Sequence, residues 1–398
     1  MKDKTVHPLG LYLHIPFCKS KCAYCDFYSL ARREEKMDDY VRALTNHLVE
    51  TAPMAAGHTV DTVYFGGGTP SYLGSERMAQ LLQTVKKHYR VAKDAEITME
   101  ANPDSLFDWK SLRALRRLGL NRISLGVQSS DDTMLRSIGR IHSWQQVVEA
   151  AEEVRRAKIP DLSLDLIYGL PDQTMEQWQK TLADALSLSP EHISCYGLKL
   201  EEGTPLWCRR ESLDLPDDEA QAQMYLYTVE HLRQSGYEQY EISNFARPGH
   251  ASRHNLKYWT LGEYAGFGPG AHSDFGNVRY AYSADLDAYL QGHLVLSESE
   301  TMEEQEREQE YIMLALRTAA GLDVKTFENR FRCRFDALEK LLRRYADHGL
   351  AQATEYGWRL TPEGFLVSNA IISSLVEALA QEKLRRQEKT QRGDYRIV

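Results

Sequence analysis

The chain has 398 residues, of which 42% are hydrophobic and 26% charged, a composition typical of a soluble globular protein with a large core. Its net charge of −9 disfavours broad binding to nucleic acid or anionic lipid. No run reaches the ~18 apolar residues of a membrane-spanning helix, and the opening MKDKTVHPLG lacks the apolar stretch of a signal peptide. We therefore expect a cytoplasmic protein without a transmembrane segment, which leaves room for peripheral membrane contact.

Residues 1–235 alternate short strand-like runs with amphipathic helical patterns. The expected strands are LYLHIP, TVYFGG, EITMEANP, RISLGVQ, LSLDLIYGLP and HISCYGLKL. The expected helices lie at 37–52, 75–90, 108–118, 143–157 and 174–188. Such strand–helix units predict a parallel α/β sheet, either doubly wound or rolled into a partial barrel. Polar motifs follow several of these strands, so we expect the functional site at their carboxyl ends.

The composition and pattern of the sequence change after residue 235. Residues 236–300 are rich in glycine and aromatic side chains, which predicts an irregular segment packed against the barrel. Residues 301–385 show two helices, a short hairpin at LAQATEYGWRLT and a closing helix, an order typical of a winged-helix-like domain. Residues 386–398 form a charged tail.

The stretch PFCKSKCAYC places Cys18, Cys22 and Cys25 at C-x3-C-x2-C spacing directly after the first expected strand. A site made only of thiolates suits zinc or an iron–sulfur cluster. Three thiolates on a four-iron cluster leave one iron open for a substrate or cofactor. The simpler alternative is a buried helix in which the cysteines serve as small apolar residues. Pro16 and the strand-like run before it favour a loop instead.

A structural zinc site needs four ligands, usually from two separated cysteine pairs. No second pair is formed by the other cysteines, which are Cys195, Cys208 and Cys333. A zinc site would therefore depend on His7 or His14 as the fourth ligand. We favour the iron–sulfur interpretation over zinc.

The cysteine motif, with Tyr24 before its last cysteine, resembles that of the radical S-adenosylmethionine (SAM) superfamily. The resemblance implies a partial (β/α)6 radical SAM barrel with a [4Fe–4S] cluster on Cys18, Cys22 and Cys25. It also implies that the open iron binds the amino and carboxylate groups of SAM. GGGTP, which contains Gly67, Gly68 and Thr69, resembles the motif that meets the SAM amino group, and glycine lets the backbone approach a ligand closely.

Further SAM contacts follow from the same resemblance. The positions that match are Tyr12, Tyr24, Glu100, Gln128, Arg140 and Asp165. An aspartate inside an apolar strand is costly to bury without a partner, so Asp165 independently favours a polar site, with a structural salt bridge as the alternative. Without the resemblance, Arg140 would be interpreted as a charged side chain on the exposed face of a helix.

Within the superfamily, nearly the whole chain resembles the oxygen-independent coproporphyrinogen oxidases and their heme-chaperone relatives. Phe27 stands where the oxidases have an additional cysteine, and only eleven residues precede Tyr12, where the oxidases have an extension. The sequence RHNLKYW contains H-N-x-x-Y-W, a signature of the chaperone branch linked to heme. It implies heme contacts by His254, Tyr258 and Trp259, with Asn255 in the same motif.

A neutral histidine can ligate heme iron, so His254 is the first candidate for the axial ligand. Its rivals are His250, His272, Tyr264 and Cys208. We expect a heme chaperone that takes heme from a donor and delivers it to a heme-accepting protein, with a [4Fe–4S] cluster, SAM and heme as cofactors and no catalytic residue assigned.

Two alternatives remain open. One is an oxygen-independent coproporphyrinogen III oxidase or another radical SAM enzyme acting on tetrapyrroles, although Phe27 and the short N-terminal segment argue against oxidase activity. The other is a nucleic-acid-binding module at the winged-helix-like end, which the acidic charge balance opposes.

Overall fold

The computed structural model describes residues 7–394, and the chain divides into two units. The first contains the residues up to Glu238, Ser243–Lys257 and Gly262–Thr301. The second contains Gln239–Ile242, Tyr258–Leu261 and the residues from Met302 onward. No helix among the described residues is long and apolar enough to cross a membrane.

The first unit is built on six parallel strands that are neighbours in the order β1-β4-β5-β6-β7-β8. Their bounds are β1 His7–Ile15, β4 His58–Gly67, β5 Val91–Ala101, β6 Arg122–Gln128, β7 Asp161–Tyr168 and β8 His192–Gly197. All six predicted strands are present, and the predicted partial (β/α)6 barrel is confirmed.

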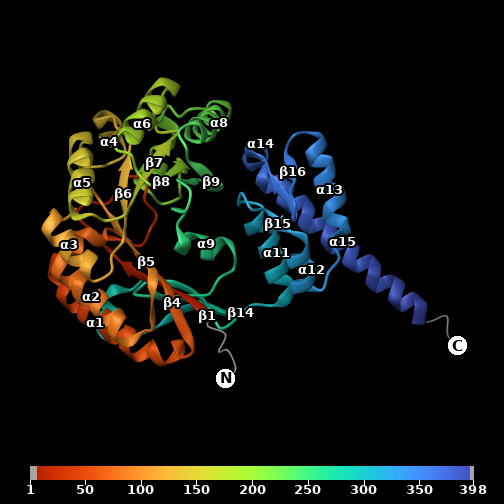
Figure 1. Ribbon diagram of the computed structural model, residues 1–398, viewed down its shortest axis with the longest axis horizontal. Coiled ribbons are helices and arrows are strands. Elements are labelled where there is room, and N and C mark those ends of the chain that lie inside the picture. The colour runs from red at the N-terminus through yellow and green to blue at the C-terminus, as the bar shows by residue number, and fades with distance from the viewer. Residues whose placement is uncertain (1–6, 395–398) are drawn as a thin grey trace. The chain divides into compact units, whose positions relative to one another are not determined.

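Helices cover the outer side of these strands (Figure 1). Their bounds are α1 Met37–Thr51, α2 Ser75–His88, α3 Trp109–Arg117, α5 Trp144–Ala157, α6 Met175–Ser187 and α8 Asp218–Gln234, with the short α4 Asp132–Ser137 and α7 Pro205–Cys208 between them. Local sequence fixes several starts, because capping boxes at Ser143 and Thr174 satisfy the first amide groups of α5 and α6.

Alternate residues of the strands point to opposite faces. On β1 and β4, Leu11, Leu13, Val63 and Phe65 are fully buried in the core under the helices. The residues between them point inward, and the strand register aligns them in rows that cross the sheet. Two such rows are Gly10–Thr62–Glu96 and Tyr12–Tyr64–Thr98. Polar side chains from different strands therefore share the inner face of the barrel.

The segment 236–300, predicted to be irregular, instead extends the sheet. Its elements are β9 Glu238–Glu241, β10 Asn244–Ala246, α9 Arg253–Trp259, β11 Tyr264–Phe267, β12 His272–Phe275, β13 Val278–Tyr282, α10 Leu286–Leu290 and β14 Leu296–Thr301. β10 pairs with β8, and β11 pairs with β1, so this one segment covers both edges of the parallel sheet. Strands this short have too few alternating positions for a sequence pattern to show them.

The second unit is mostly helical. Its elements are α11 Glu304–Ala315, β15 Leu322–Asp323, α12 Val324–Phe331, α13 Asp336–Asp347, β16 Ala351–Ala353, β17 Gly357–Leu360, α14 Pro362–Leu366 and α15 Ser368–Asp394. The hairpin β16–β17 follows two helices and is joined by β15, which matches the predicted winged-helix-like order. The charged tail is helical as far as Asp394, and its last four residues lie outside the described part of the chain.

Two short strands complete the first unit and close the cysteine loop. β2 (Phe17–Cys18) pairs in parallel with β3 (Leu30–Ala31). The Leu30 amide donates to the Pro16 carbonyl at 2.7 Å, and the Arg32 amide donates to the Cys18 carbonyl at 3.1 Å. The loop that carries the three cysteines is thus held at its base directly beyond the carboxyl end of β1.

Candidate cofactor site

Each sulfur of the cysteine loop receives a hydrogen bond. The donors are the Thr69 hydroxyl to Cys18 at 3.4 Å, the Arg140 guanidinium to Cys22 at 3.4 Å, and the Phe27 amide to Cys25. Burial nevertheless raises the pKa of the Cys18 thiol, and raises that of Cys25 to about 11. The thiols would therefore ionise on binding a metal, and these donors would then stabilise the thiolates.

The donor set fits an iron–sulfur cluster better than zinc. Among residues 7–394, no three histidine, cysteine, aspartate or glutamate side chains gather closely enough to hold one metal ion. Zinc would need all its sulfurs within about 2.3 Å of one ion, whereas a four-iron cluster spreads its ligands over separate irons. His14, a proposed fourth zinc ligand, is already engaged through Nε2 with the Tyr28 carbonyl at 2.8 Å and through Nδ1 with the Tyr12 hydroxyl at 3.0 Å.

The cysteine loop contains two lysines, Lys19 and Lys21, but neither is the positively charged side chain that lies closest to a cysteine sulfur. Lys19 pairs with Asp104 at 3.5 Å, and Lys21 donates to the Phe27 carbonyl at 3.2 Å. Arg140 takes that position instead: it is 8% exposed and also donates to Asn102 Oδ1 at 2.8 Å. The interpretation of Arg140 as a surface helix charge is therefore wrong.

The glycines of GGGTP pack against the cysteine strand. A Cβ on Gly68 would lie 2.8 Å from the Ile15 and Phe17 carbonyl oxygens, and a Cβ on Gly67 would lie 2.5 Å from the His14 ring. The Gly68 and Thr69 amides donate to the Ile15 and Phe17 carbonyls, each at 2.8 Å. These contacts explain why the backbone needs glycine here. The contact of Gly67, Gly68 and Thr69 with SAM stays a prediction.

Two carboxyl groups face the barrel interior beyond the GGGTP turn. Glu100 accepts hydrogen bonds from the Tyr64 hydroxyl at 2.8 Å and from the Gly67 amide at 3.1 Å, and burial raises its pKa to about 7. Asp165 accepts from the Ser124 hydroxyl at 3.0 and 3.1 Å, and burial raises its pKa as well. Hydroxyl partners, rather than a salt bridge, hold Asp165, which suits a polar binding site.

The remaining predicted SAM contacts lie on the same side of the barrel. Gln128 ends β6 in a left-handed conformation with φ 67°, a strained backbone of the kind found at functional sites. Burial raises the pKa of the Tyr24 hydroxyl, and Tyr12 stacks on Tyr64 with ring centroids 6.2 Å apart. Tyr64 itself was not predicted. Its only sequence signal is an inward position two residues before the first glycine of GGGTP, and its partner lies on another strand.

The histidine of the H-N-x-x-Y-W motif lies against the inner face near the middle of the strands, beside Gly10, Thr62 and Glu96. His254 is 1% exposed, its Nδ1 lies 2.8 Å from the Thr62 hydroxyl, and its amide donates to Glu96 at 2.9 Å. Its ring stacks on that of Tyr64 at 5.1 Å, and burial lowers its pKa to about 3, so the imidazole is neutral. Gly10 makes room for it, because a Cβ there would lie 3.2 Å from its ring.

The same segment spans the inner side of the barrel toward the amino ends of the strands. Arg122 of β6 donates to the His250 carbonyl at 2.9 Å, and His250 Nδ1 contacts Asp161 of β7. Lys257 pairs with Asp61 at 2.8 Å. Residues 250–257 thus form a floor below the inner face. Ligation of heme by His254 stays a prediction, and it requires this floor to open.

Tyr258 and Trp259, the other predicted heme contacts, are partly exposed and belong to the second unit. The Trp259 indole nitrogen is buried without a hydrogen-bond partner among the described residues. Of the rival heme ligands, His272 and Cys208 are exposed.

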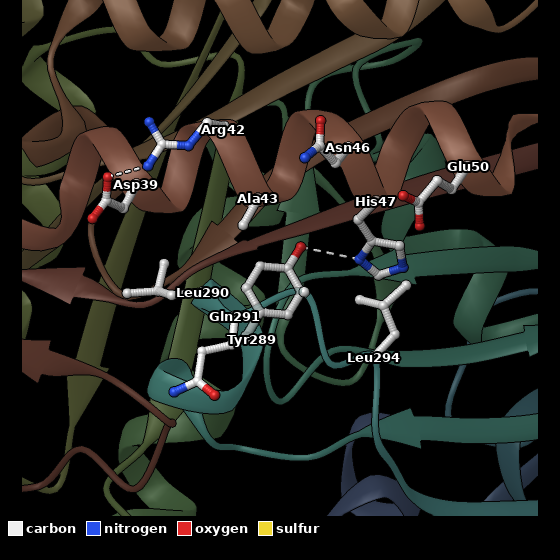
Figure 2. Close-up of a pocket in the computed structure, with 11 residues that line it drawn as sticks. Asp39, Arg42, Ala43, Asn46, His47, Glu50, Tyr289, Leu290, Gln291 and Leu294 are labelled. Atoms are coloured by element: carbon white, nitrogen blue, oxygen red, sulfur yellow. Dashed lines mark hydrogen bonds and ion pairs between the residues drawn. The ribbon is translucent and has the colours of Figure 1, made fainter.

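A separate cavity of about 170 Å³ lies between α1 and the chain that follows α10 (Figure 2). Asp39, Arg42 and Glu50 line it, and His47 Nδ1 lies 3.0 Å from the Tyr289 hydroxyl at its wall. Burial lowers the pKa of His47 to about 4. None of the lining residues belongs to the cysteine loop or to the carboxyl ends of the six strands, so this cavity is not part of the cofactor site.

Comparison with known proteins identifies the family. Residues 12–185 match the model of the radical SAM superfamily, and residues 302–367 match the model of the HemN C-terminal domain. The chain is 34% identical to the heme chaperone HemW of Bacillus subtilis, over 92% of this chain and 99% of that protein. It is 37% identical to HemW of Escherichia coli, over 92% of this chain and 97% of that protein.

A solved structure shares the architecture. It is coproporphyrinogen III oxidase (HemN) from Escherichia coli, described as a radical SAM enzyme, with a TM-score of 0.80 and 26% identity over 94% of this chain and 90% of that chain. With 94% of the chain covered, the similarity includes most of both units. The chain belongs to the HemW family of radical SAM proteins.

Proposed function

We propose that this protein is a cytoplasmic heme chaperone, which binds heme and passes it to a heme-accepting protein while holding a SAM-binding [4Fe–4S] cluster. The observation that carries the proposal is the similarity to heme chaperones along 97–99% of their own length. The cysteine loop and the inner carboxylates lie within residues 12–185, which match the radical SAM model, and much of the second unit lies within residues 302–367, which match the HemN C-terminal model.

Cys18, Cys22 and Cys25 would hold the cluster, which when bound supplies an electron for reductive cleavage of SAM. Arg140 and Thr69 direct N–H and O–H groups at two of the sulfurs, which favours the thiolate state. Glu100 and Asp165 present carboxylate oxygens toward the barrel interior, where they accept hydrogen bonds from hydroxyl groups. The same acceptors suit the hydroxyls of a ribose.

The oxidase alternative shares the fold but not the loop chemistry. Phe27 occupies the position of the additional oxidase cysteine, and its side chain is 65% exposed. An exposed phenylalanine can neither ligate a metal nor donate a proton. We therefore infer that the protein does not decarboxylate coproporphyrinogen III.

Heme contacts are proposed for the partly exposed Tyr258 and Trp259, whose rings offer apolar area to a porphyrin. The iron ligand requires a separate comparison, because His254 is enclosed by Thr62 and Tyr64 whereas His272 and Cys208 are exposed. If His254 ligates the iron, heme uptake should be slow, because α9 must first move away from the inner face of the barrel.

The test offers heme and coproporphyrinogen III in parallel to anaerobic, cluster-reconstituted protein. We expect a Soret band from bound heme, transfer of that heme to an apo-hemoprotein, and no protoporphyrinogen. The iron ligand is then identified with three variants compared at equal cluster content: His254→Ala, His272→Ala and Cys208→Ala. The variant whose Soret band shifts lacks the ligand. Absence of heme binding, or robust conversion of coproporphyrinogen III, would contradict the chaperone function.

A further inference from the structure

The H-N-x-x-Y-W helix and the Glu100 carboxylate are joined by one side chain. Tyr64 stands on β4 in the inner row between them. Its ring lies on the His254 ring at 5.1 Å with a 22° interplanar angle, and its hydroxyl donates to Glu100 Oε1 at 2.8 Å. Both contacts lie within the first unit.

We propose that Tyr64, supported from below by His254, is a positioning residue for SAM that fixes the Glu100 carboxylate for the ribose hydroxyls. The H-N-x-x-Y-W helix is then a structural element of the SAM pocket in addition to any role with heme. This inference rests on the part of the proposed function that places SAM beside Glu100, and it does not depend on heme transport.

Both ends of this arrangement are held firmly. His254 is fixed by Thr62 at its Nδ1 and by Glu96 at its amide, so its ring offers Tyr64 a rigid surface. At the other end, Gly66 leaves space for the contact, because a Cβ there would lie 2.8 Å from the Tyr64 ring and 3.0 Å from Glu100 Oε1. A residue with a side chain at position 66 would force the hydroxyl and the carboxylate apart.

The hydroxyl also controls the charge of Glu100. Glu100 faces Asp165 on β7, Tyr64 on β4 and the Gly67 amide. Burial and the nearby Asp165 raise its pKa, the donors Tyr64 and Gly67 lower it, and together they leave it at about 7. Loss of the Tyr64 hydroxyl therefore leaves a larger protonated fraction of Glu100 at neutral pH. A protonated carboxyl is a poorer acceptor for two ribose hydroxyls.

The experiment measures SAM affinity in heme-free, cluster-reconstituted protein, from the change that SAM causes in the electron paramagnetic resonance of the reduced cluster. The Tyr64→Phe variant keeps the ring and loses the hydroxyl. We expect its SAM affinity at pH 7 to fall about tenfold, as for loss of one hydrogen bond to a charged group. The pH at which affinity is half-maximal should move upward. The matched control is Tyr89→Phe, which removes a buried hydroxyl bonded to the Leu48 carbonyl at 2.8 Å.

A double-mutant cycle separates positioning from a general structural effect. In a Glu100→Gln background, Tyr64→Phe should cost almost nothing further, because the carboxylate it orients is gone. His254→Ala should weaken SAM binding about threefold without heme present, and the exposed His293→Ala should not. If Glu100→Gln weakens SAM binding but Tyr64→Phe matches the wild type in affinity and pH midpoint, the inference is overturned alone. If Glu100→Gln also has no effect, SAM lies elsewhere and its proposed site fails too, whatever the heme assays show.

Discussion

Glu100 and Asp165 show how the inner face of the barrel differs from its helix-covered face. Both carboxyls sit on strands whose neighbouring residues are buried and apolar, and burial raises the pKa of each. Their hydrogen-bond donors are the neutral groups of Tyr64, Gly67 and Ser124. Such carboxyls are costly to ionise in the cofactor-free protein and become useful when a polyhydroxylated ligand is bound.

The stability of cluster-free protein should therefore depend on pH through Glu100. Its pKa is raised in the folded state from 4.5 to about 7, so its contribution is fully present below about pH 4.5 and is lost as pH rises through 7. Relative to the Glu100→Gln variant, the free energy of unfolding of the wild type should fall by at most about 3 kcal/mol over this pH range. Urea unfolding of both proteins between pH 5 and pH 8 measures the difference. A difference that does not change with pH would contradict the raised pKa.

At the scale of elements, the GGGTP turn and the cysteine strand form one packed unit. The turn donates two amides to the backbone around β2, and its Thr69 hydroxyl reaches Cys18. The position of Cys18 thus depends on a close backbone approach that only glycine permits.

Replacing Gly68 with alanine should disrupt cluster incorporation. The new Cβ would meet three backbone atoms of Ile15 and Phe17 at 2.8–2.9 Å, and backbone cannot move aside as a flexible side chain can. We expect iron and sulfide content after reconstitution to fall several-fold. Gly74→Ala is the control, because an alanine there would be strained at φ +96° but its Cβ would meet only Arg77, at 3.5 Å. Normal iron content in Gly68→Ala would show that Cys18 tolerates displacement of the turn.

The floor of the barrel is a second element-scale feature, and Glu96 anchors it. Glu96 is 8% exposed and accepts the amides of Arg253 and His254 at the start of α9, each at 2.9 Å. Glu96→Gln keeps the shape but removes the charge, which should weaken the seating of α9 by about 1–2 kcal/mol. Hydrogen exchange should then accelerate in 250–259 but not in α5. The exposed Glu149→Gln is the control, and equal exchange in both variants would contradict the anchoring role.

Over the whole molecule, the sequence predicted those elements that have a local periodic pattern of apolar residues. The six strands and their helices carry alternating or 3.6-residue patterns, and the cysteine spacing is contained in eight residues. The strands β10–β14 were missed because each is short, and β10 and β11 also pair with strands that lie far earlier in the chain. Tyr64 was missed for the same physical reason, since its role depends on a register with β5 and on a helix about 190 residues later. The placement of Arg140 came from resemblance alone, because the residue lies in the loop between α4 and α5 and its neighbours in the sequence give no sign of burial.

The cluster loop contributes little to the hydrophobic core of the first unit: Phe17 and Cys18 are buried at its base, and Tyr24 packs on a smaller cluster that includes Ile138 and Ile167. Backbone hydrogen bonds also fix that loop, for example from the Ala23 amide to the Ile138 carbonyl at 2.9 Å. Removal of the cluster by chelation should therefore leave far-ultraviolet circular dichroism unchanged. Faster hydrogen exchange should be confined to residues 18–31 and 138–141. Loss of cooperative unfolding throughout the barrel would instead mean that the cluster is required for the fold.

The pairing of β11 with β1 and of β10 with β8 also determines when the edges of the sheet can form during synthesis on the ribosome. β1 is complete at Ile15, but its outer partner begins at Tyr264, about 250 residues later. At the usual 5–20 residues per second, the edge of β1 waits roughly 12–50 s for its pairing strand. During that interval the nascent chain presents unpaired backbone and apolar surface, so its yield in the cell should depend on holdase proteins that shield such edges. The floor under Tyr64 forms only at the end of that wait, which makes the proposed SAM pocket one of the last parts of the first unit to mature.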